Sequence, residues 1–396
     1  MENFNYYTPT KIVFGKGTES QTGQLVKEQN CKKVLIHYGS GSVKRSGLLD
    51  RIKASLDNEG INYVELGGVV PNPRLSLVYE GINLCRREGV DFILAVGGGS
   101  VIDSAKAIGY GTANDGDVWD FYDFKRQAAA CLPIGAVLTI AAAGSEMSSS
   151  SVITKEEGLI KRGYSNNLSR AKFAVMNPEL TMTLPAYQTA SGCVDILMHT
   201  MERYFNQSDN MELTDGISEA LMRTVMKNAK ILKEQPDNYE ARAEVMWAGS
   251  LSHNGLTGCG TDGGDWATHK MEHEIGGLFD VAHGAGLSAI WGSWARFVLD
   301  ARPERFAKFA VNVLDIEPTG SSAEAVTETA LKGIEAMEEF YRSIDMPTSF
   351  AELGVRPTAE QIRTMAEKCD IGTRHSTGIV KKLSVDDMVE IYTNAL

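Results

Sequence analysis

DFILAVGGGS, residues 91–100, is the stretch that decides the fold of this 396-residue chain. Its apolar run FILAV has the length and composition of a buried parallel strand. Three glycines and Ser100 follow at once, and the next residues, VIDSAKAIG, have helical spacing of apolar side chains. The glycines therefore lie at a strand-to-helix turn, which matters more than their number.

This turn is suited to a phosphate group. Without Cβ atoms, the backbone at Gly98 and Gly99 can approach a pyrophosphate closely, and the N–H groups of the following helix favour its negative charge. Ser100 offers a further donor. A tight turn without a ligand is the alternative interpretation, because the GxGxxG spacing of an ordinary dinucleotide-binding turn is absent.

The rest of the chain predicts two domains. Apolar runs such as KKVLIHYG from Lys32 alternate with helical segments such as residues 75–88, so residues 1–185 are expected to form a dinucleotide-binding α/β domain with a Rossmann-like parallel sheet. Residues 186–396 show helical periodicity, with caps at Thr358 and Ser384, and predict an all-helical metal-binding and substrate domain. The segment TLPAYQTAS around Pro185 marks the boundary.

Composition excludes several kinds of partner. The 51 acidic and 39 basic residues give a net charge of −12, which disfavours nucleic acid. No apolar run approaches the roughly 20 residues that span a bilayer, and the first residues lack a signal peptide's features. Six scattered cysteines without a CxxC pair indicate free thiols. We expect an unprocessed cytoplasmic protein without nucleic-acid or membrane partners.

A second strand end bears on the choice of nicotinamide cofactor. The run from Ile36 leads into Gly39-Ser40-Gly41-Ser42, where a carboxylate would be expected if the site gripped an unphosphorylated ribose. Small residues leave space for a 2′-phosphate, and Lys44 and Arg45 lie just beyond. The sequence therefore favours NADP(H) over NAD(H).

An Asp and His pattern is the strongest chemical signal in the chain. In SGCVDILMHTME, Asp195 and His199 stand four residues apart on a helical segment. Side chains at this spacing project from one helix face, with Cβ atoms about 6 Å apart. Both can therefore bind one ion.

A second histidine pair supplies the remaining ligands. In DWATHKMEHEIGG, His269 and His273 repeat the four-residue spacing, and His283 follows after the helix is broken at Gly276-Gly277. The spacing offers four histidines for three places beside Asp195 and leaves the choice between them open.

The ligand types restrict the metal. Three neutral imidazoles and one carboxylate suit Fe²⁺ or Zn²⁺ and are poor for Ca²⁺ or Mg²⁺, which prefer oxygen shells. Asp262 and Asp265 are also candidates, but loop carboxylates before a helix more often cap it. His37, His253 and His375 lie outside the pattern.

Taken together, these motifs resemble the iron-dependent (group III) alcohol dehydrogenase family. The stretches GGDWATHKMEHE and HGAGL look closest to its butanol dehydrogenase and NADPH-dependent aldehyde reductase branch. The likeness runs from about Tyr7 to the C-terminus and includes, in the family's order, FGKG, PNP, GGGSVID, GSE and NPELTMTLP. Two departures are Ala143, where many members carry a hydroxyl residue, and Asn177, where the usual residue is Asp.

The resemblance implies residue roles. It implies that the metal ligands are Asp195, His199, His269 and His283, and that His273 lies near the nicotinamide as the catalytic residue. It also implies a homodimer and a set of cofactor contacts, namely Gly39, Ser42, Asn72, Gly98, Gly99, Ser100, Asp103, Thr139, Ser145, Lys161, Thr181 and Leu184.

We expect a metal-dependent alcohol dehydrogenase or aldehyde reductase that transfers hydride between NADP(H) and short- to medium-chain alcohols or aldehydes, such as butanol and butyraldehyde. Apolar residues near the histidines favour this substrate class, namely Trp266, Leu278, Phe279, Trp291 and Phe297. A glycerol-type polyol dehydrogenase and a dehydroquinate synthase-like lyase are alternatives on the same fold. A nucleotide-binding protein with a structural metal is the non-catalytic alternative.

Overall fold

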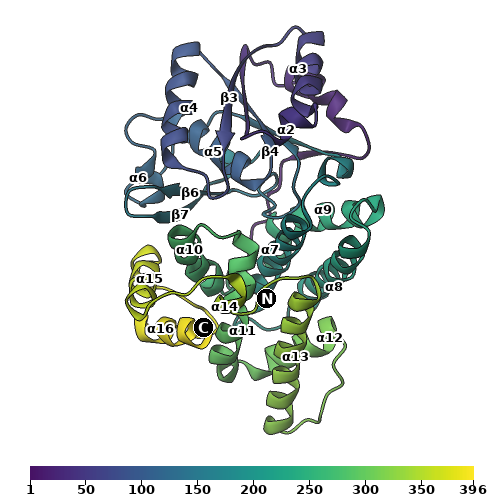
Figure 1. The fold of residues 1–396 in the computed structure, drawn as a ribbon, viewed down its shortest axis with the longest axis vertical. Coiled ribbons are helices and arrows are strands. Elements are labelled where there is room, and N and C mark those ends of the chain that lie inside the picture. The colour runs from purple at the N-terminus through teal and green to yellow at the C-terminus, as the bar shows by residue number, and fades with distance from the viewer. The chain divides into compact units, whose positions relative to one another are not determined.

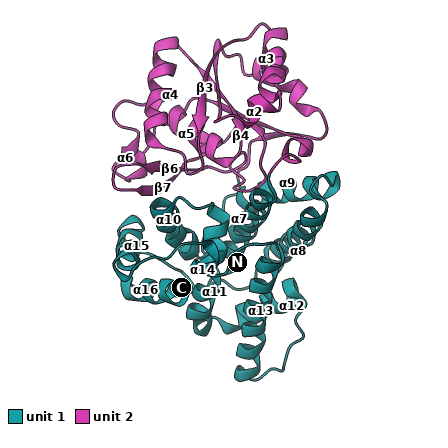
Figure 2. Ribbon diagram, viewed as in Figure 1, with its two compact units in different colours: residues 1–6, 185–396 teal, residues 7–184 magenta.

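The computed structural model describes residues 1–396 and divides them into two compact units, which are described separately (Figure 2). The sheet unit is residues 7–184, and the helical unit is residues 1–6 with 185–396. The first six residues were expected in the α/β domain. They belong to the helical unit because the Met1 ammonium donates to the Asp209 carbonyl at 3.1 Å and the Glu2 amide to the Gly260 carbonyl at 2.9 Å.

The sheet unit contains the predicted Rossmann-like parallel sheet (Figure 1). The strand order is β1-β8-β5-β4-β2-β3, and every neighbouring pair is parallel. Because β3 and β4 lie on opposite sides of β2, the chain reverses direction across the sheet between β2 and β4. In such sheets, ligands bind outside the carboxyl ends at this reversal. The strands are β1 (Lys11–Phe14), β2 (Lys33–Gly39), β3 (Asn62–Val69), β4 (Phe92–Gly97), β5 (Ile134–Leu138) and β8 (Phe173–Met176).

Helices cover both faces of this sheet. Helices α1 (Thr22–Lys27) and α3 (Leu48–Asn58) share a core with alternate residues of β2, including Ile36 and Tyr38. Between these two, His37 points to the other face, where its Nε2 lies 2.8 Å from Ser104 Oγ on α5 (Gly99–Ala113). All six residues of β4 are buried, as expected for a central parallel strand.

Smaller elements complete the sheet unit. Strands β6 (Ser150–Lys155) and β7 (Ile160–Ser165) form a separate antiparallel pair. Helix α4 (Leu75–Glu88) packs beside α5. The short helices are η1 (Thr18–Gln21), α2 (Ser42–Arg45), α6 (Trp119–Tyr122), η2 (Asn167–Ser169) and η3 (Pro178–Thr181).

The helical unit has no strands. Helix α7 packs against α8, α9 and α11, and α11 packs against α10. None of its helices, nor any in the sheet unit, combines the length and apolar character needed to cross a bilayer. Its helices are α7 (Ala186–Tyr204), α8 (Glu212–Glu234), α9 (Tyr239–His253), η4 (Leu256–Gly258), α10 (Ala267–Phe279), α11 (His283–Val298), η5 (Leu299–Ala301), α12 (Pro303–Leu314), α13 (Ala323–Ser343), α14 (Phe350–Leu353), α15 (Ala359–Gly372) and α16 (Val385–Asn394).

Helix ends test the sequence signals directly. The predicted caps are confirmed, because Thr358 and Ser384 each form a capping box at the start of α15 and α16. The predicted break at Gly276-Gly277 is wrong. Both glycines are buried inside α10, where tertiary packing overrides their low helix propensity. The helix ends at Phe279, and its C-cap residue Asp280 has a left-handed φ of 54°.

Candidate metal centre and cofactor edge

The glycine turn joins β4 directly to α5. Gly98 is the extended N-cap residue of the helix, and Gly99 and Ser100 form its first turn. No side chain caps this N-terminus, so its amides are oriented towards whatever lies beyond the strand end. The next strand end is tied to the turn, since the Thr139 amide donates to the Gly97 carbonyl at 3.1 Å.

Most predicted cofactor residues lie at one edge of the sheet. Gly39, Asn72, Gly98, Thr139 and Thr181 come at or after the carboxyl ends of β2, β3, β4, β5 and β8 respectively. Parallel strands bring their carboxyl ends to the same edge, so residues far apart in sequence share it. Ser42 begins α2, just after β2, whereas Lys161 lies buried on β7 of the separate antiparallel pair.

Thr181 and Leu184 form hydrogen bonds within the chain. The Thr181 hydroxyl donates to the Pro178 carbonyl at 2.8 Å, and the Leu184 amide donates to the Thr181 carbonyl at 3.2 Å. These bonds fix the segment that follows β8 and ends the sheet unit. They also engage the Leu184 amide within the chain.

Asp103 is built into a buried polar network. Its carboxylate accepts a hydrogen bond from Ser145 Oγ at 2.6 Å and another from the Val152 amide at 3.0 Å. These bonds join α5 to residues 145–152. The predicted residues Asp103 and Ser145 therefore contact each other, and Asp103 holds residues 145–152 against α5.

Lys106 completes this network and was missed by the sequence analysis. It is fully buried, and its ammonium donates to the carbonyls of Ser145 at 2.7 Å, Ser148 at 3.0 Å and Ser150 at 2.7 Å. Burial lowers the pKa of Lys106 to about 8. Its signal in the sequence is a lysine three residues after Asp103 in the helix that follows the glycines.

The end of β2 has the small residues expected of an NADP(H) site. Residues 39–42 carry no carboxylate. Lys44 Nζ lies 5.1 Å from the centre of the Tyr38 ring, so its charge stays close to this strand. The Arg45 guanidinium lies over Gly41, where an added Cβ would be 2.7 Å from Nη1.

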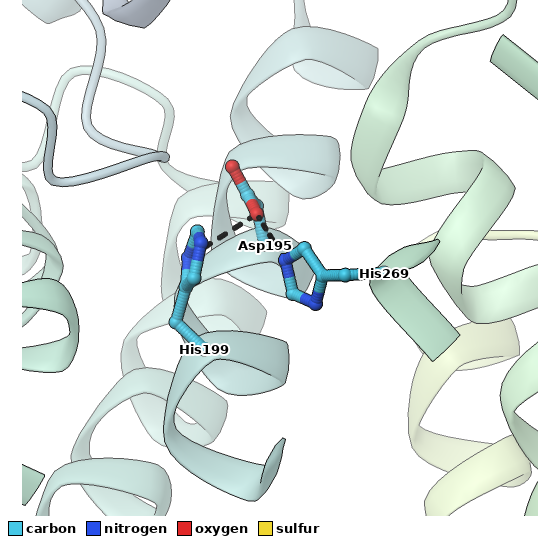
Figure 3. Close-up of side chains that lie close together, drawn as sticks. All are labelled: Asp195, His199 and His269. Carbon is cyan, nitrogen blue, oxygen red and sulfur yellow. Dashed lines mark ion pairs between the residues drawn. The ribbon is translucent and has the colours of Figure 1, made fainter. Parts of the chain in front are cut away.

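Asp195 is the centre of the polar cluster in the helical unit. Asp195 and His199 come from α7, and His269 comes from α10 (Figure 3). Asp195 Oδ1 lies 3.3 Å from His199 Nδ1 and 3.7 Å from His269 Nε2. The ligand atoms of these three buried residues all lie within 4.8 Å of one another.

His283 brings a third imidazole to the same oxygen. It is the first residue of α11, and its Nε2 lies 3.8 Å from Asp195 Oδ1. The close approach of α11 to α7 depends on Gly284, because an added Cβ there would lie 2.0 Å from the Ser191 carbonyl oxygen. Nitrogens of His199, His269 and His283 thus all lie within 3.8 Å of Asp195 Oδ1.

The chemistry of these donors fits a divalent metal ion. Asp195 Oδ1 and His199 Nδ1 are buried without a hydrogen-bond partner, which is costly unless another ligand satisfies them. Burial raises the pKa of Asp195, but the neighbouring His199, His269 and His283 outweigh this effect and hold it well below its usual range. The carboxylate therefore stays ionised and available to a cation.

Two further carboxylates orient the imidazoles, and the sequence analysis missed both. Glu202 Oε1 lies 3.0 Å from His269 Nδ1 and also accepts the His269 amide at 2.9 Å. Glu272 Oε2 pairs with His283 Nδ1. A carboxylate on one ring nitrogen fixes the tautomer and directs the other towards a metal. Each glutamate follows a candidate histidine by three residues, which is the signal that could have found it.

His273 groups with Glu272 and His283. Its ring is buried, with its centre 5.9 Å from that of the His283 ring, and its ligand atom lies within 4.8 Å of those of Glu272 and His283.

Asp265, also a candidate ligand from the sequence, instead caps α10 and binds a distant loop. Its carboxylate accepts amide hydrogen bonds from Ala267 at 2.9 Å, Ile379 at 2.7 Å and Val380 at 2.8 Å.

The apolar residues that suggested a substrate pocket do not gather as one group. Trp266 lies by the cluster, with its ring 5.3 Å from that of His269. Trp291 instead packs in the helical core, 6.1 Å from the Tyr341 ring, and Phe297 lies under Lys381 at 4.1 Å. Aromatic residues at helical spacing commonly serve the core, and sequence cannot separate the two uses.

Comparisons with known proteins cover the whole chain. Residues 9–178 match the family described as iron-containing alcohol dehydrogenase, and residues 189–396 match its C-terminal family. The chain is 41% identical over 100% of both chains to a probable NADH-dependent butanol dehydrogenase of Bacillus subtilis. It is 33% identical over 90% of both chains to the NADPH-dependent aldehyde reductase of Escherichia coli.

A solved structure shows the same fold. The crystal structure of an NADH-dependent butanol dehydrogenase A from Thermotoga maritima superposes with a TM-score of 0.95 at 38% identity, covering 100% of this chain and 99% of that one. Both the sequence and the fold therefore agree with the two family matches. The chain belongs to the iron-containing alcohol dehydrogenase family.

Proposed function

We propose that this protein is a metal-dependent, NAD(P)-dependent alcohol dehydrogenase that interconverts short- to medium-chain alcohols and aldehydes. The approach of three imidazole nitrogens to a single point, the buried Asp195 Oδ1, is the observation that carries the proposal. The names of relatives support the substrate class, since they include butanol dehydrogenases and an aldehyde reductase. Trp266 supplies an apolar surface beside this point.

Each group has a distinct task in the proposed reaction. Asp195, His199, His269 and His283 would hold a divalent ion, which would supply Lewis acidity towards a substrate oxygen, and a bound nicotinamide would supply or accept hydride. Glu202 and Glu272 keep the His269 and His283 rings turned with Nε2 towards Asp195. The amides of Gly99 and Ser100 at the start of α5 bind cofactor phosphate.

His273 is the proposed site of proton transfer. It sits on α10 one helical turn from His269, close to Glu272 and His283 but outside the set around Asp195. Its ring nitrogen can hold the proton that an alcohol loses or an aldehyde gains. Replacing His273 with alanine is expected to lower turnover and change its pH profile while metal content stays intact.

The finer choice of cofactor and metal is also a proposal. The end of β2 has no carboxylate, and Lys44 and Arg45 lie beyond it, which supports NADP(H) over NAD(H). Among the relatives, some are named as NADH-dependent and others as NADPH-dependent. The donor set suits Fe²⁺ or Zn²⁺, and the family description supports iron.

Anaerobic reconstitution tests these points together. Metal-free protein is loaded separately with Fe²⁺, Zn²⁺, Mn²⁺ or Co²⁺, and consumption of NADPH and NADH is followed with aldehydes from acetaldehyde to hexanal. Turnover with an aldehyde that depends on added metal, and a lower KM for NADPH than for NADH, are expected. Bound metal and cofactor without any turnover would instead support a non-catalytic nucleotide-binding protein. Faster oxidation of glycerol than of butanol would favour a polyol dehydrogenase.

A further inference from the structure

The three candidate histidine ligands are not supported in the same way. Glu202 pairs with Nδ1 of His269, and Glu272 pairs with Nδ1 of His283. His199 has no such carboxylate, and its ion pair is with Asp195, itself a candidate ligand. Its Nδ1 is buried without a hydrogen-bond partner. A different contact must therefore hold the plane of the His199 ring.

Aromatic rings supply that contact. The His253 ring, at the last residue of α9, lies with its centre 4.0 Å from that of His199 and at an interplanar angle of 58°. Trp266 lies against both, with ring centres 6.1 Å from His199 and 6.0 Å from His253. His253 is thus the nearest ring to this candidate ligand and limits its rotation.

Arg203 fixes His253 in turn. Its Nη1 donates to the carbonyls of His199 at 2.7 Å and Ser252 at 3.1 Å, and its Nη2 lies 3.3 Å from His253 Nδ1. The guanidinium also lies over the Trp266 ring, 4.6 Å from its centre. Because arginine only donates, His253 Nδ1 must accept, so the neutral ring carries its hydrogen on Nε2. One cation therefore sets both the position and the tautomer of His253.

We propose that His253, held by Arg203, is a positioning residue for the candidate metal ligand His199. This inference rests on the metal centre of the proposed function. The His253 ring packs against His199 and keeps its Nδ1 directed at Asp195 Oδ1. Ring packing does the orienting at His199 that a carboxylate does at the other two imidazoles.

Cobalt binding provides a test that does not depend on turnover. Full-length protein is loaded with Co²⁺, and its visible d–d absorption and the rate of metal loss to a chelator are measured for wild type, His253→Ala and His253→Phe. His253→Ala is expected to shift the absorption bands and to speed metal loss about tenfold or more, the scale seen when support of a metal ligand is removed. His253→Phe keeps a ring at this place and is expected to stay within about threefold of wild type.

His375→Ala is the matched control, because that histidine is exposed and pairs with Asp370 on α15, outside the cluster. It should leave both readouts unchanged. Thermal unfolding of the metal-free variants shows whether each one folds. If His253→Ala does not fold, Arg203→Met, which releases the His253 ring, decides the matter and is expected to speed metal loss about tenfold.

Three results overturn the inference. One is an unchanged spectrum and loss rate in a folded His253→Ala variant, another is equal effects of the Ala and Phe substitutions, and the last is an unchanged loss rate in Arg203→Met when that variant decides. Failure of the proposed function is distinguishable. If the metal centre is absent, the wild type shows no d–d bands with Co²⁺; if only catalysis is absent, the wild type keeps the bands but turns over no aldehyde.

Discussion

The proposed cofactor edge of the sheet unit and the candidate metal centre of the helical unit are built in opposite ways. At the sheet edge, the proposed cofactor contacts are mostly backbone groups at strand ends. They lie next to a motif that the sequence shows directly, such as Gly97-Gly98-Gly99. At the metal centre, side chains from α7, α10 and α11 meet at Asp195. A backbone site therefore tolerates changes of side chain that fit the space, whereas a side-chain site fails when one donor is lost.

Removing the central carboxylate should give the largest effect. Asp195→Ala removes the only anionic ligand and leaves three neutral imidazoles. Bound metal should therefore fall close to zero, and kcat/KM should fall by about a thousandfold or more. Metal analysis and steady-state kinetics measure both. Asp262→Asn, in the loop before α10, is the control and should keep metal and activity. An Asp195→Ala protein with full metal content would remove the basis of the contrast.

Gly284→Ala should come next. The added Cβ would lie 2.0 Å from the Ser191 carbonyl oxygen, so α11 must move away from α7 and carry His283 with it. We expect a loss of about 3 kcal/mol in unfolding free energy, together with weaker metal binding. Gly216→Ala on α8, which meets nothing within 4 Å, should be harmless. A stable, metal-loaded Gly284→Ala variant would contradict the close approach.

A histidine of the sheet unit should behave unlike those of the metal centre. His37 is fully buried, with Nδ1 2.9 Å from the Leu66 carbonyl, and burial lowers its pKa to about 4. The unfolded chain therefore binds its proton more readily between about pH 6.5 and 4. Stability from neutral His37 is present above pH 6.5 and is lost as the pH falls through this window.

Urea unfolding of wild type and His37→Gln measures this effect. The stability difference between them should shrink by roughly 2 kcal/mol between pH 7.5 and pH 5. Metal content should be the same in both. A difference that does not vary with pH would mean that His37 is not held neutral.

Changing cofactor preference should be the mildest intervention. Gly39 has no positive φ, and a Cβ there would only touch the Val69 carbonyl oxygen at 3.6 Å, so Gly39→Asp should fold. The new carboxylate would repel a 2′-phosphate and could bind a free ribose hydroxyl. KM for NADPH should rise about tenfold or more, with KM for NADH unchanged or lower. The variant Gly39→Asn, without the charge, serves as control, and an unchanged NADPH preference in Gly39→Asp would place the phosphate elsewhere.

The contrast also explains what the sequence could predict. The parallel sheet, the glycine turn and the helix caps follow from local patterns, and the structure has them. The pairing of Asp195 with His199 follows from helical spacing. The choice among His269, His273 and His283 does not, because it depends on how α10 and α11 pack against α7. The structure groups His273 with Glu272 and His283, and its role stays a proposal.

Supporting residues were the harder part. Glu202, Glu272 and Lys106 are charged groups in buried positions, and a charged residue on a helix is usually exposed. Only the packed structure shows that each has partners that offset the cost of burying its charge. Arg203 and His253 gave no signal at all, since stacking between rings leaves no fixed spacing in the sequence.

The attachment of residues 1–6 to the helical unit has a consequence for synthesis. Residues 1–6 belong to that unit, residues 7–184 form the sheet unit, and residues 185–396 belong to the helical unit again, so the sheet unit is an insertion between two parts of one body. Met1 and its acceptor Asp209 are 208 residues apart. At a ribosomal rate of about 5–20 residues per second, the N-terminal segment waits roughly 10–40 seconds for its place, while the sheet unit can already fold.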